Sequence, residues 1–225
     1  MGCTMDRAND LIEQLLSNPD SSEFGALANE LLTQYHRGSP VGSLRILLHS
    51  ANDRVVGEGA WIASELGESG KPLLPDISRL LRHPSKKVRF WSIDCVHLWA
   101  GPSSADELAS AVGLVDDPEE AVRWKAMGFL AMASREQLQA ALGNLTKTNP
   151  TSQYTRGLKW LIGVEETDPA EIIDALRSND QLRRKIAAAA AYRLWNRDSA
   201  PLHFATSIDD HEVVQFARDM LKRVS

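Results

Sequence analysis

The stretch EEAVRWKAMGFLAMA, residues 119–133, decides the fold class of this chain. Counted from Val122, apolar or small residues follow at plus four, seven, eight and eleven: Ala126, Phe129, Leu130 and Ala133. This spacing puts them on one side of a helix and predicts a buried stripe. Trp124 falls on the opposite side. A large apolar side chain in that position needs its own explanation.

The same pattern recurs along the chain. Its starting residues lie 28 to 34 positions apart and are Val55, Val88, Val122, Tyr154, Leu182 and Val213. Three residues before each start stands one of Asn52, Ser85, Glu119, Thr151, Asn179 and Asp210. Five of these six are residue types that cap helix N-termini well. A repeat of this length is typical of a helical solenoid.

Shorter apolar segments separate the six predicted helices. They begin near Ser43, Leu73, Ala105, Glu136, Ala170 and Pro201, and prolines stand near several of these starts. Proline is tolerated in the first turn of a helix because its missing N–H is not needed there. Each segment is therefore predicted to be the first helix of a pair, and each stripe-bearing helix the second.

Two of the repeats resemble a known family. The stretches SKKVRFWSIDCVHLWAG and DDPEEAVRWKAMGFLAMA are similar to HEAT or HEAT-like repeats, whose second helix often opens with a Val-Arg pair. That pair is present as Val88-Arg89 and Val122-Arg123, with Leu182-Arg183 close to it. The resemblance covers roughly residues 40–225. It implies that these arginines pair with acidic residues of adjacent units, for which Asp117 and Asp180 are candidates.

The sequence therefore predicts an all-α, right-handed α-solenoid of about six to seven antiparallel helix pairs. We expect one domain over residues 1–225, with residues 1–39 as an N-terminal capping helix pair and residues 40–225 as the repeats.

Composition limits the function classes. The net charge of −5 argues against a general nucleic-acid binder, because such proteins usually carry positive charge on the binding domain. No apolar run approaches the ~18 residues of a membrane-spanning helix. The N-terminus lacks a basic region followed by an apolar one. We therefore expect a cytoplasmic monomer without a membrane partner.

A search for chemistry yields few candidates. The six histidines show no metal-ligand spacing, and no phosphate-binding loop or nucleophile elbow is present. The paired carboxylates stand before predicted helices, where they offset the helix dipole. We expect no catalytic residue, no metal and no cofactor, and favour a protein that is not an enzyme.

A basic patch stands at the turn between two predicted helices. It comprises Arg79, Arg82, Lys86, Lys87 and Arg89. Two interpretations stay open: a solvated turn, or an anchor for an acidic partner or a phosphate.

The side of the second helices opposite the stripe supplies the candidate binding residues. We expect these helices to line a concave groove that presents Trp61, Phe90, Trp124, Met127, Arg156, Lys159, Trp160 and Arg184. Exposed aromatic residues beside arginine are typical of binding hot spots. The alternative is that neighbouring repeats cover the tryptophans.

Two functions from different classes follow. The leading hypothesis is a non-catalytic module that binds a protein or peptide in the groove, similar to bacterial adaptors and immunity proteins. The alternative is a HEAT-like alkylpurine DNA glycosylase, or another nucleic-acid-binding solenoid, using Phe90, Asp94, Trp124 and Trp160. A third is a chaperone or lyase acting on a pigment-bearing protein.

Overall fold

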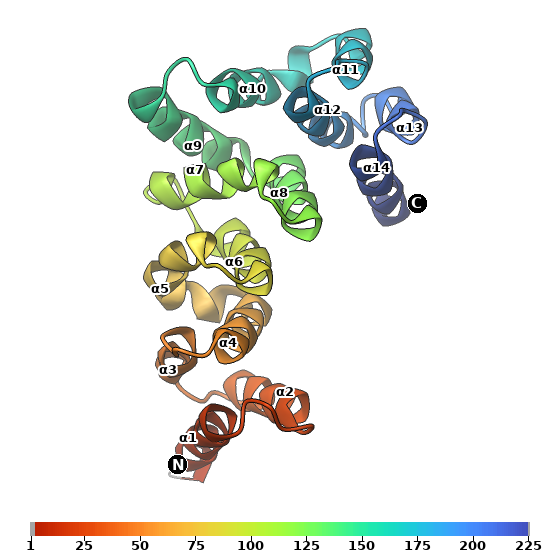
Figure 1. The fold of residues 1–225 in the computed structure, drawn as a ribbon. Helices are drawn as coiled ribbons and strands as arrows, with labels where there is room; N and C mark the ends of the chain where they lie inside the picture. The colour runs from red at the N-terminus through yellow and green to blue at the C-terminus, as the bar shows by residue number, and fades with distance from the viewer. Residues whose placement is uncertain (1–2, 225) are drawn as a thin grey trace. The chain divides into compact units, whose positions relative to one another are not determined.

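The computed structural model describes residues 3–224, and that range contains helices and no strand (Figure 1). The α-helices are α1 Cys3–Ser17, α2 Phe24–His36, α3 Arg45–Leu48, α4 Asp53–Glu65, α5 Leu74–Ser78, α6 Lys86–Trp99, α7 Ala105–Gly113, α8 Glu120–Met132, α9 Arg135–Thr148, α10 Gln153–Ile162, α11 Pro169–Leu176, α12 Gln181–Arg193, α13 Ala200–Ala205 and α14 His211–Val224. The predicted all-α fold class is confirmed.

Short 3₁₀ segments complete several of the helical hairpins. They are η1 Val41–Leu44, η2 Gly67–Leu73, η3 Arg79–Arg82, η4 Leu114–Asp116 and η5 Val164–Glu166. The chain forms two compact units, Met1–Trp99 and Ala100–Ser225.

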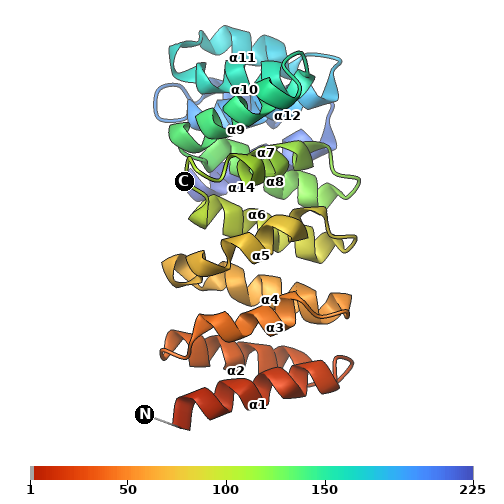
Figure 2. The same ribbon diagram turned by 90° about the vertical axis from the view of Figure 1, so that its left-hand side faces the viewer.

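The first unit is a two-layered stack of helices. In Figure 2, α1, α3 and α5 lie toward the viewer, and α2, α4 and α6 lie behind them. Within the rear layer, α4 packs on α2 and on α6. The repeat pattern explains this packing, because Val55, Ile62, Val88 and Val96 are fully buried.

Trp99 closes the core of the first unit at the end of α6. Its indole Nε1 donates to the carbonyl oxygen of Gly67 at 2.6 Å, and its ring lies over Gly70. A Cβ atom on residue 70 would lie 2.2 Å from Cζ2 of Trp99. Glycine is therefore required there by the close approach of the ring.

The second unit departs from the expected regular stacking. Helix α7 packs on α9, but α8 packs on α12 and also contacts α14, while α10 packs on α9 and α12 (Figure 1). Helix α10, which was predicted to be the second helix of its pair, thus packs on α9 and α12. The run of alanines at 187–191 in α12 is fully buried. Small side chains of this kind let several helices approach α12 closely.

The buried stripe of α8 is confirmed residue by residue. All its predicted members are at most 2% exposed: Val122, Ala126, Phe129, Leu130 and Ala133. In α10 the predicted first member, Tyr154, is half-buried and the next residue, Thr155, is buried instead.

Two helices begin one residue later than predicted. Ser152 caps α10 by accepting from the backbone N–H of Thr155, and Asp180 caps α12 by accepting from that of Arg183. Thr151 and Asn179 were the predicted caps. The predicted caps of α4 and α14 are confirmed, since Asn52 and Asp210 both accept backbone N–H groups of the first turn.

Candidate functional site

The basic patch is only partly a surface feature. Arg89 is buried, and its Nη1 donates to the carbonyl oxygens of His83 and Pro84 at 2.7 and 2.8 Å. The expectation that Arg89 is a surface charge is therefore wrong, because its guanidinium satisfies the turn before α6. Lys87 forms an ion pair with Glu58.

The remaining members of the patch differ in exposure and bonding. Nη2 of Arg79 donates to the carbonyl oxygen of Leu48 at 2.7 Å. Arg82 and Lys86 are exposed. In the same unit, the candidate binding residues Trp61 and Phe90 are half-buried.

Met127 and Trp124 do not face an open groove. Met127 has no exposed area, so its predicted place on the binding surface is wrong. Trp124 is half-buried, its indole Nε1 is buried, and that N–H makes no hydrogen bond of ordinary geometry. The physical reason is that α12 and α14 pack against α8, where an open surface was expected.

Asp219 of α14 marks the contact with Trp124. Partial burial raises the pKa of Asp219, but hydrogen bonds from Gln215 and Lys222, the positive charge of Lys222 and the nearby indole of Trp124 outweigh it, so that the pKa lies below its ordinary value. Trp124 is therefore covered at its polar edge by α14.

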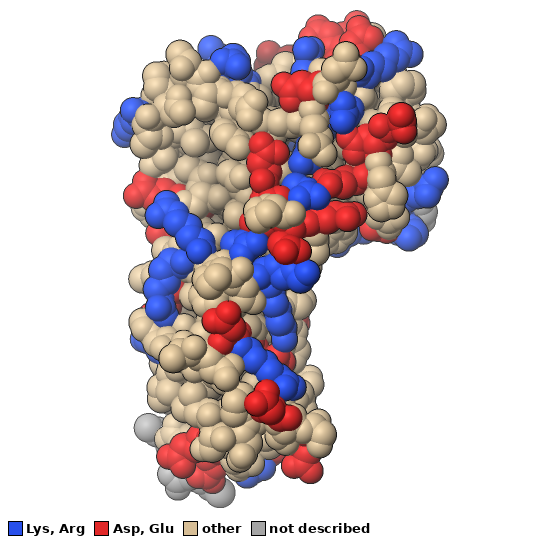
Figure 3. Space-filling model, in the orientation of Figure 1, with Lys and Arg blue, Asp and Glu red and all other residues tan. Residues whose placement is uncertain are grey.

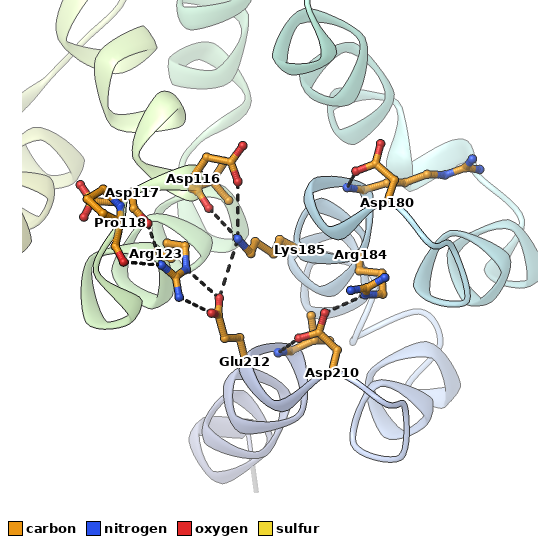
Figure 4. A network of polar contacts seen from close by, with 12 residues as sticks. Asp116, Asp117, Pro118, Arg123, Asp180, Arg184, Lys185, Asp210 and Glu212 are labelled. Atoms are coloured by element: carbon orange, nitrogen blue, oxygen red, sulfur yellow. Dashed lines mark hydrogen bonds and ion pairs between the residues drawn. The ribbon is translucent and has the colours of Figure 1, made fainter.

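A polar network holds α14 against α8 (Figure 4). Nε of Arg123 donates to Oε2 of Glu212 at 2.9 Å, and Nη2 donates to Oε1 of the same carboxylate. Nη1 of Arg123 donates to the carbonyl oxygens of Asp117 and Pro118 at 2.7 and 2.9 Å. The Arg123 side chain thus joins the turn before α8 to α14, a helix that is distant in the sequence.

Lys185 extends this network from α12. Its side chain is 1% exposed, and Nζ lies 3.2 Å from the carbonyl oxygen of Val115, 3.5 Å from Oδ1 of Asp116 and 3.7 Å from Oε2 of Glu212. A buried ammonium requires such partners, because its desolvation would otherwise be costly. Figure 3 shows the basic and acidic side chains of this region side by side over α8, α12 and α14.

Arg184 also belongs to this intramolecular network. Its Nε donates to Oδ2 of Asp210 at 2.7 Å, and its Nη1 donates to the carbonyl oxygen of Ser178 at 2.7 Å. The predicted groove position of Arg184 is therefore wrong, because its guanidinium already binds α14 and the turn before α12. The implied pairing of Arg183 with an acidic neighbour is likewise absent among the side chains of residues 7–224, where Arg184 makes such a pair instead.

A common geometry links four arginines. Arg89, Arg123, Arg156 and Arg184 each stand four residues after the residue that precedes their helix, and each directs Nη1 to a carbonyl of the turn before it. The repeat pattern places this arginine directly after Tyr154 in α10 and after Leu182 in α12. The arginines that bind the turn are Arg156 and Arg184, one position later, and the helix caps are shifted by the same one residue. Arg156 is therefore the α10 member of a structural series.

A cavity of about 340 Å³ lies between α10 and α12. We call it the α10–α12 cleft, and it is lined by Gln153, Arg156, Gly157, Trp160, Asp180, Leu182, Arg183 and Ile186. Volumes of this size are at the lower end of ligand pockets. Two of the predicted binding residues, Arg156 and Trp160, meet here, and a third, Lys159, is exposed on the same helix.

The cleft is lined by both apolar and polar side chains. Leu182 and Ile186 from α12 face Trp160 and Gly157 from α10. A Cβ atom on residue 157 would lie 2.3 Å from Cδ1 of Ile186, so a larger residue at this position would require the terminal methyl of Ile186 to move. The sequence pattern missed Ile186 and Gln153 as site residues, because the register of α10 against α12 is visible only in three dimensions.

The aromatic and acidic set considered for a DNA glycosylase is divided. Phe90 and Asp94 belong to α6 in the first unit, and Trp124 and Trp160 to the second. Within the second unit, Trp160 lines the cleft between α10 and α12, whereas Trp124 belongs to α8 and does not line that cleft.

No group of three His, Cys, Asp or Glu side chains is placed to hold a metal ion in the described part of the chain. In the same part, no helix has the length and apolar character needed to cross a membrane.

The fold defines the class of this protein as an all-α solenoid of helical repeats. No protein-family model and no curated protein matches the chain. Among solved structures, the chain is similar to a designed armadillo repeat protein in complex with the peptide (KR)4. The sequence identity is 17%, the TM-score is 0.48, and the match covers 96% of this chain and 98% of that one.

Proposed function

We propose that this solenoid is a non-catalytic module that binds a protein or peptide, and that the α10–α12 cleft anchors the partner. The observation that carries the proposal is the meeting of Arg156, Arg183 and Trp160 around one cavity. Arginine and tryptophan are the residue types most enriched at energetic hot spots of interfaces. Neither arginine forms an ion pair with a carboxylate among the side chains that the structure describes, those of residues 7–224, so their charges are available to a partner.

The repeats are HEAT-like in this proposal. Its support is the Val-Arg pair that opens α6 and α8 and the binding of both arginines to the preceding turn. A single-chain binding module of this kind would act as an adaptor or as an immunity-type protein. The identity of its partner distinguishes the two roles.

Quantitative affinity capture tests the proposal. The tagged chain is incubated with nuclease-treated native lysate, and bound proteins are compared by mass spectrometry between the unmodified chain and Trp160→Ala or Arg156→Ala. A specific partner should be lost from both variants. Lys147→Ala is the matched control, because Lys147 is exposed on α9 and does not line the cleft.

Two controls make the result decisive. Circular dichroism and thermal midpoints must show that each variant is folded. A set of bound proteins that is the same for the cleft variants and for Lys147→Ala would reject the cleft as the anchor.

A further inference from the structure

Three arginines of the second unit, Arg123, Arg156 and Arg184, bind the turn before their helix in the same way. A carboxylate of the chain also binds the guanidinium of Arg123 and that of Arg184, but none binds that of Arg156 among the residues that the structure describes. In Arg123, Nη1 binds the preceding turn while Nε and Nη2 bind the carboxylate of Glu212. In Arg184, Nη1 again binds the preceding turn while Nε binds the carboxylate of Asp210. Both carboxylates come from the start of another helix, α14.

Arg156 binds the preceding turn as Arg123 and Arg184 do, but it lacks their bond to a carboxylate. Its Nη1 donates to the carbonyl oxygen of Thr151, which holds the guanidinium against the turn before α10. Among the residues that the structure describes, no carboxylate binds its Nε or Nη2. The side chain is exposed and lines the α10–α12 cleft.

We propose that a carboxylate of an acidic peptide occupies the open position on Arg156, with an apolar side chain of the same peptide against Trp160. This deepens the proposed function and rests on it. Charged hydrogen bonds to arginine are strongest when the guanidinium is held in place before binding, which the bond to Thr151 achieves.

The rest of the cleft fits the same ligand. Arg183 adds a second positive charge at the lining, and Lys159 adds a third on the exposed surface of α10. The lining carboxylate, Asp180, already accepts the backbone N–H of Arg183 at 3.1 Å, where it caps α12. Leu182, Ile186 and Trp160 provide apolar surface for a neighbouring side chain.

A nucleic acid fits these observations less well than a peptide. Its phosphates would also bind arginine, and a base could stack on Trp160. However, the chain carries a net charge of −5, which repels an extended polyanion more than a peptide with a few carboxylates.

Fluorescence anisotropy with three labelled octapeptides tests the inference. The peptides alternate leucine with glutamate, glutamine or lysine, and a labelled thymidine octanucleotide is the fourth probe. The glutamate peptide should bind at least about tenfold more tightly than the glutamine peptide, since a hydrogen bond from arginine to a carboxylate is stronger than one to a neutral amide. The lysine peptide should bind more weakly still.

Charge substitutions in the full chain locate the effect. Arg156→Gln and Arg183→Gln should each remove most of the advantage of the glutamate peptide. Arg183→Glu should reverse the preference toward the lysine peptide. The matched control Arg218→Gln should leave it unchanged, because Arg218 is exposed on α14 and does not line the cleft.

The possible outcomes are separable. Equal binding of the glutamate and glutamine peptides, lost in Trp160→Ala, would overturn the carboxylate inference and leave the peptide-binding function standing. Absence of peptide binding would also overturn the inference, and the capture experiment would decide the function independently. Tighter, Arg156-dependent binding of the oligonucleotide would overturn it in favour of nucleic acid.

Discussion

Arg123 and Glu212 stand 89 residues apart in sequence, and two hydrogen bonds join their side chains. Each side chain is 17% exposed, so water screens the pair only partly. Lys185 lies within 3.7 Å of the same carboxylate. Glu212 therefore balances two cations and fixes α14 against α8 and α12.

Replacing Glu212 with glutamine should destabilise the protein by about 2–4 kcal/mol, because it leaves Arg123 and Lys185 without their shared anion. Urea unfolding monitored by circular dichroism measures the change. Asp174→Asn is the control, since Asp174 pairs with Arg177 on the surface and its loss should cost less than about 1 kcal/mol. Equal effects of the two substitutions would show that the network contributes little to stability.

Trp124→Ala should mainly lower stability, whereas Trp160→Ala should mainly weaken partner binding. Trp124 is covered by α14 at its indole nitrogen, so its loss should destabilise by about 1–3 kcal/mol. Trp160 lines the cleft, and its loss should mainly weaken partner binding. Thermal midpoints and partner affinity are measured for both variants. A stable Trp124→Ala protein that loses its partner would restore the groove hypothesis for Trp124.

The repeat period could be predicted from sequence because it reflects local burial. The apolar stripe of α8 and the caps Asn52 and Asp210 depend on residues within one or two turns of each other. The one-residue shift in α10 and α12 could not be inferred, since Thr151 and Ser152 are both residue types that cap helix N-termini, as are Asn179 and Asp180. Thr155, and not Tyr154, packs into the core. This packing alone shows that Ser152 is the residue that caps α10.

The candidate site was predicted in part for a related reason. Arg156 and Trp160 share a face of α10, and helical periodicity places them together without further information. Met127, Trp124 and Arg184 were misplaced because a regular stack leaves their side of the helix open. The packing of α12 and α14 on α8 is a long-range event, and no local pattern encodes it.

Gly157→Ala tests the close approach of α10 to α12. The new methyl group would lie 2.3 Å from Cδ1 of Ile186, so Ile186 must move or the helices must separate. We expect a loss of about 1–3 kcal/mol and an altered cleft. Gly143→Ala is the control, because a Cβ atom on residue 143 would meet no atom within 4 Å and alanine favours a helix by up to about 1 kcal/mol.

Shortening Ile186 supplies the second half of that experiment. In a Gly157→Ala background, Ile186→Val removes the Cδ1 methyl that the new side chain meets. The double variant should be more stable than additivity of the single changes implies. Strict additivity in thermal unfolding would show that the two residues do not collide.

Asp76 should make the first unit sensitive to acid. Partial burial raises the pKa of Asp76, but hydrogen bonds from His49 and Arg45 outweigh it and lower the pKa below its ordinary value. A carboxylate whose pKa is lower in the folded state stabilises the protein above its unfolded pKa. That contribution is lost as the pH falls through the folded pKa.

The Asp76→Asn variant should therefore have a lower free energy of unfolding than the unmodified protein at pH 5. This difference, the stability deficit, should become smaller as the pH falls toward 2.5, a range chosen around the ordinary pKa of aspartate. Urea titrations at each pH measure the deficit. Asp20→Asn serves as control, because the Asp20 side chain is 98% exposed. A deficit that stays constant over this range would mean that the Asp76 carboxylate is not responsible.

The contact of α14 with α8 changes how the second unit should come apart. In a simple repeat array each unit contacts only its neighbours, so the terminal repeat can fray while the others persist. Here α8, α12 and α14 pack on one another although the chain between them is long. Their backbone amides should consequently share one opening free energy in native-state hydrogen exchange, as members of a single cooperative block. The second unit would then behave as a closed globule rather than as a one-dimensional array.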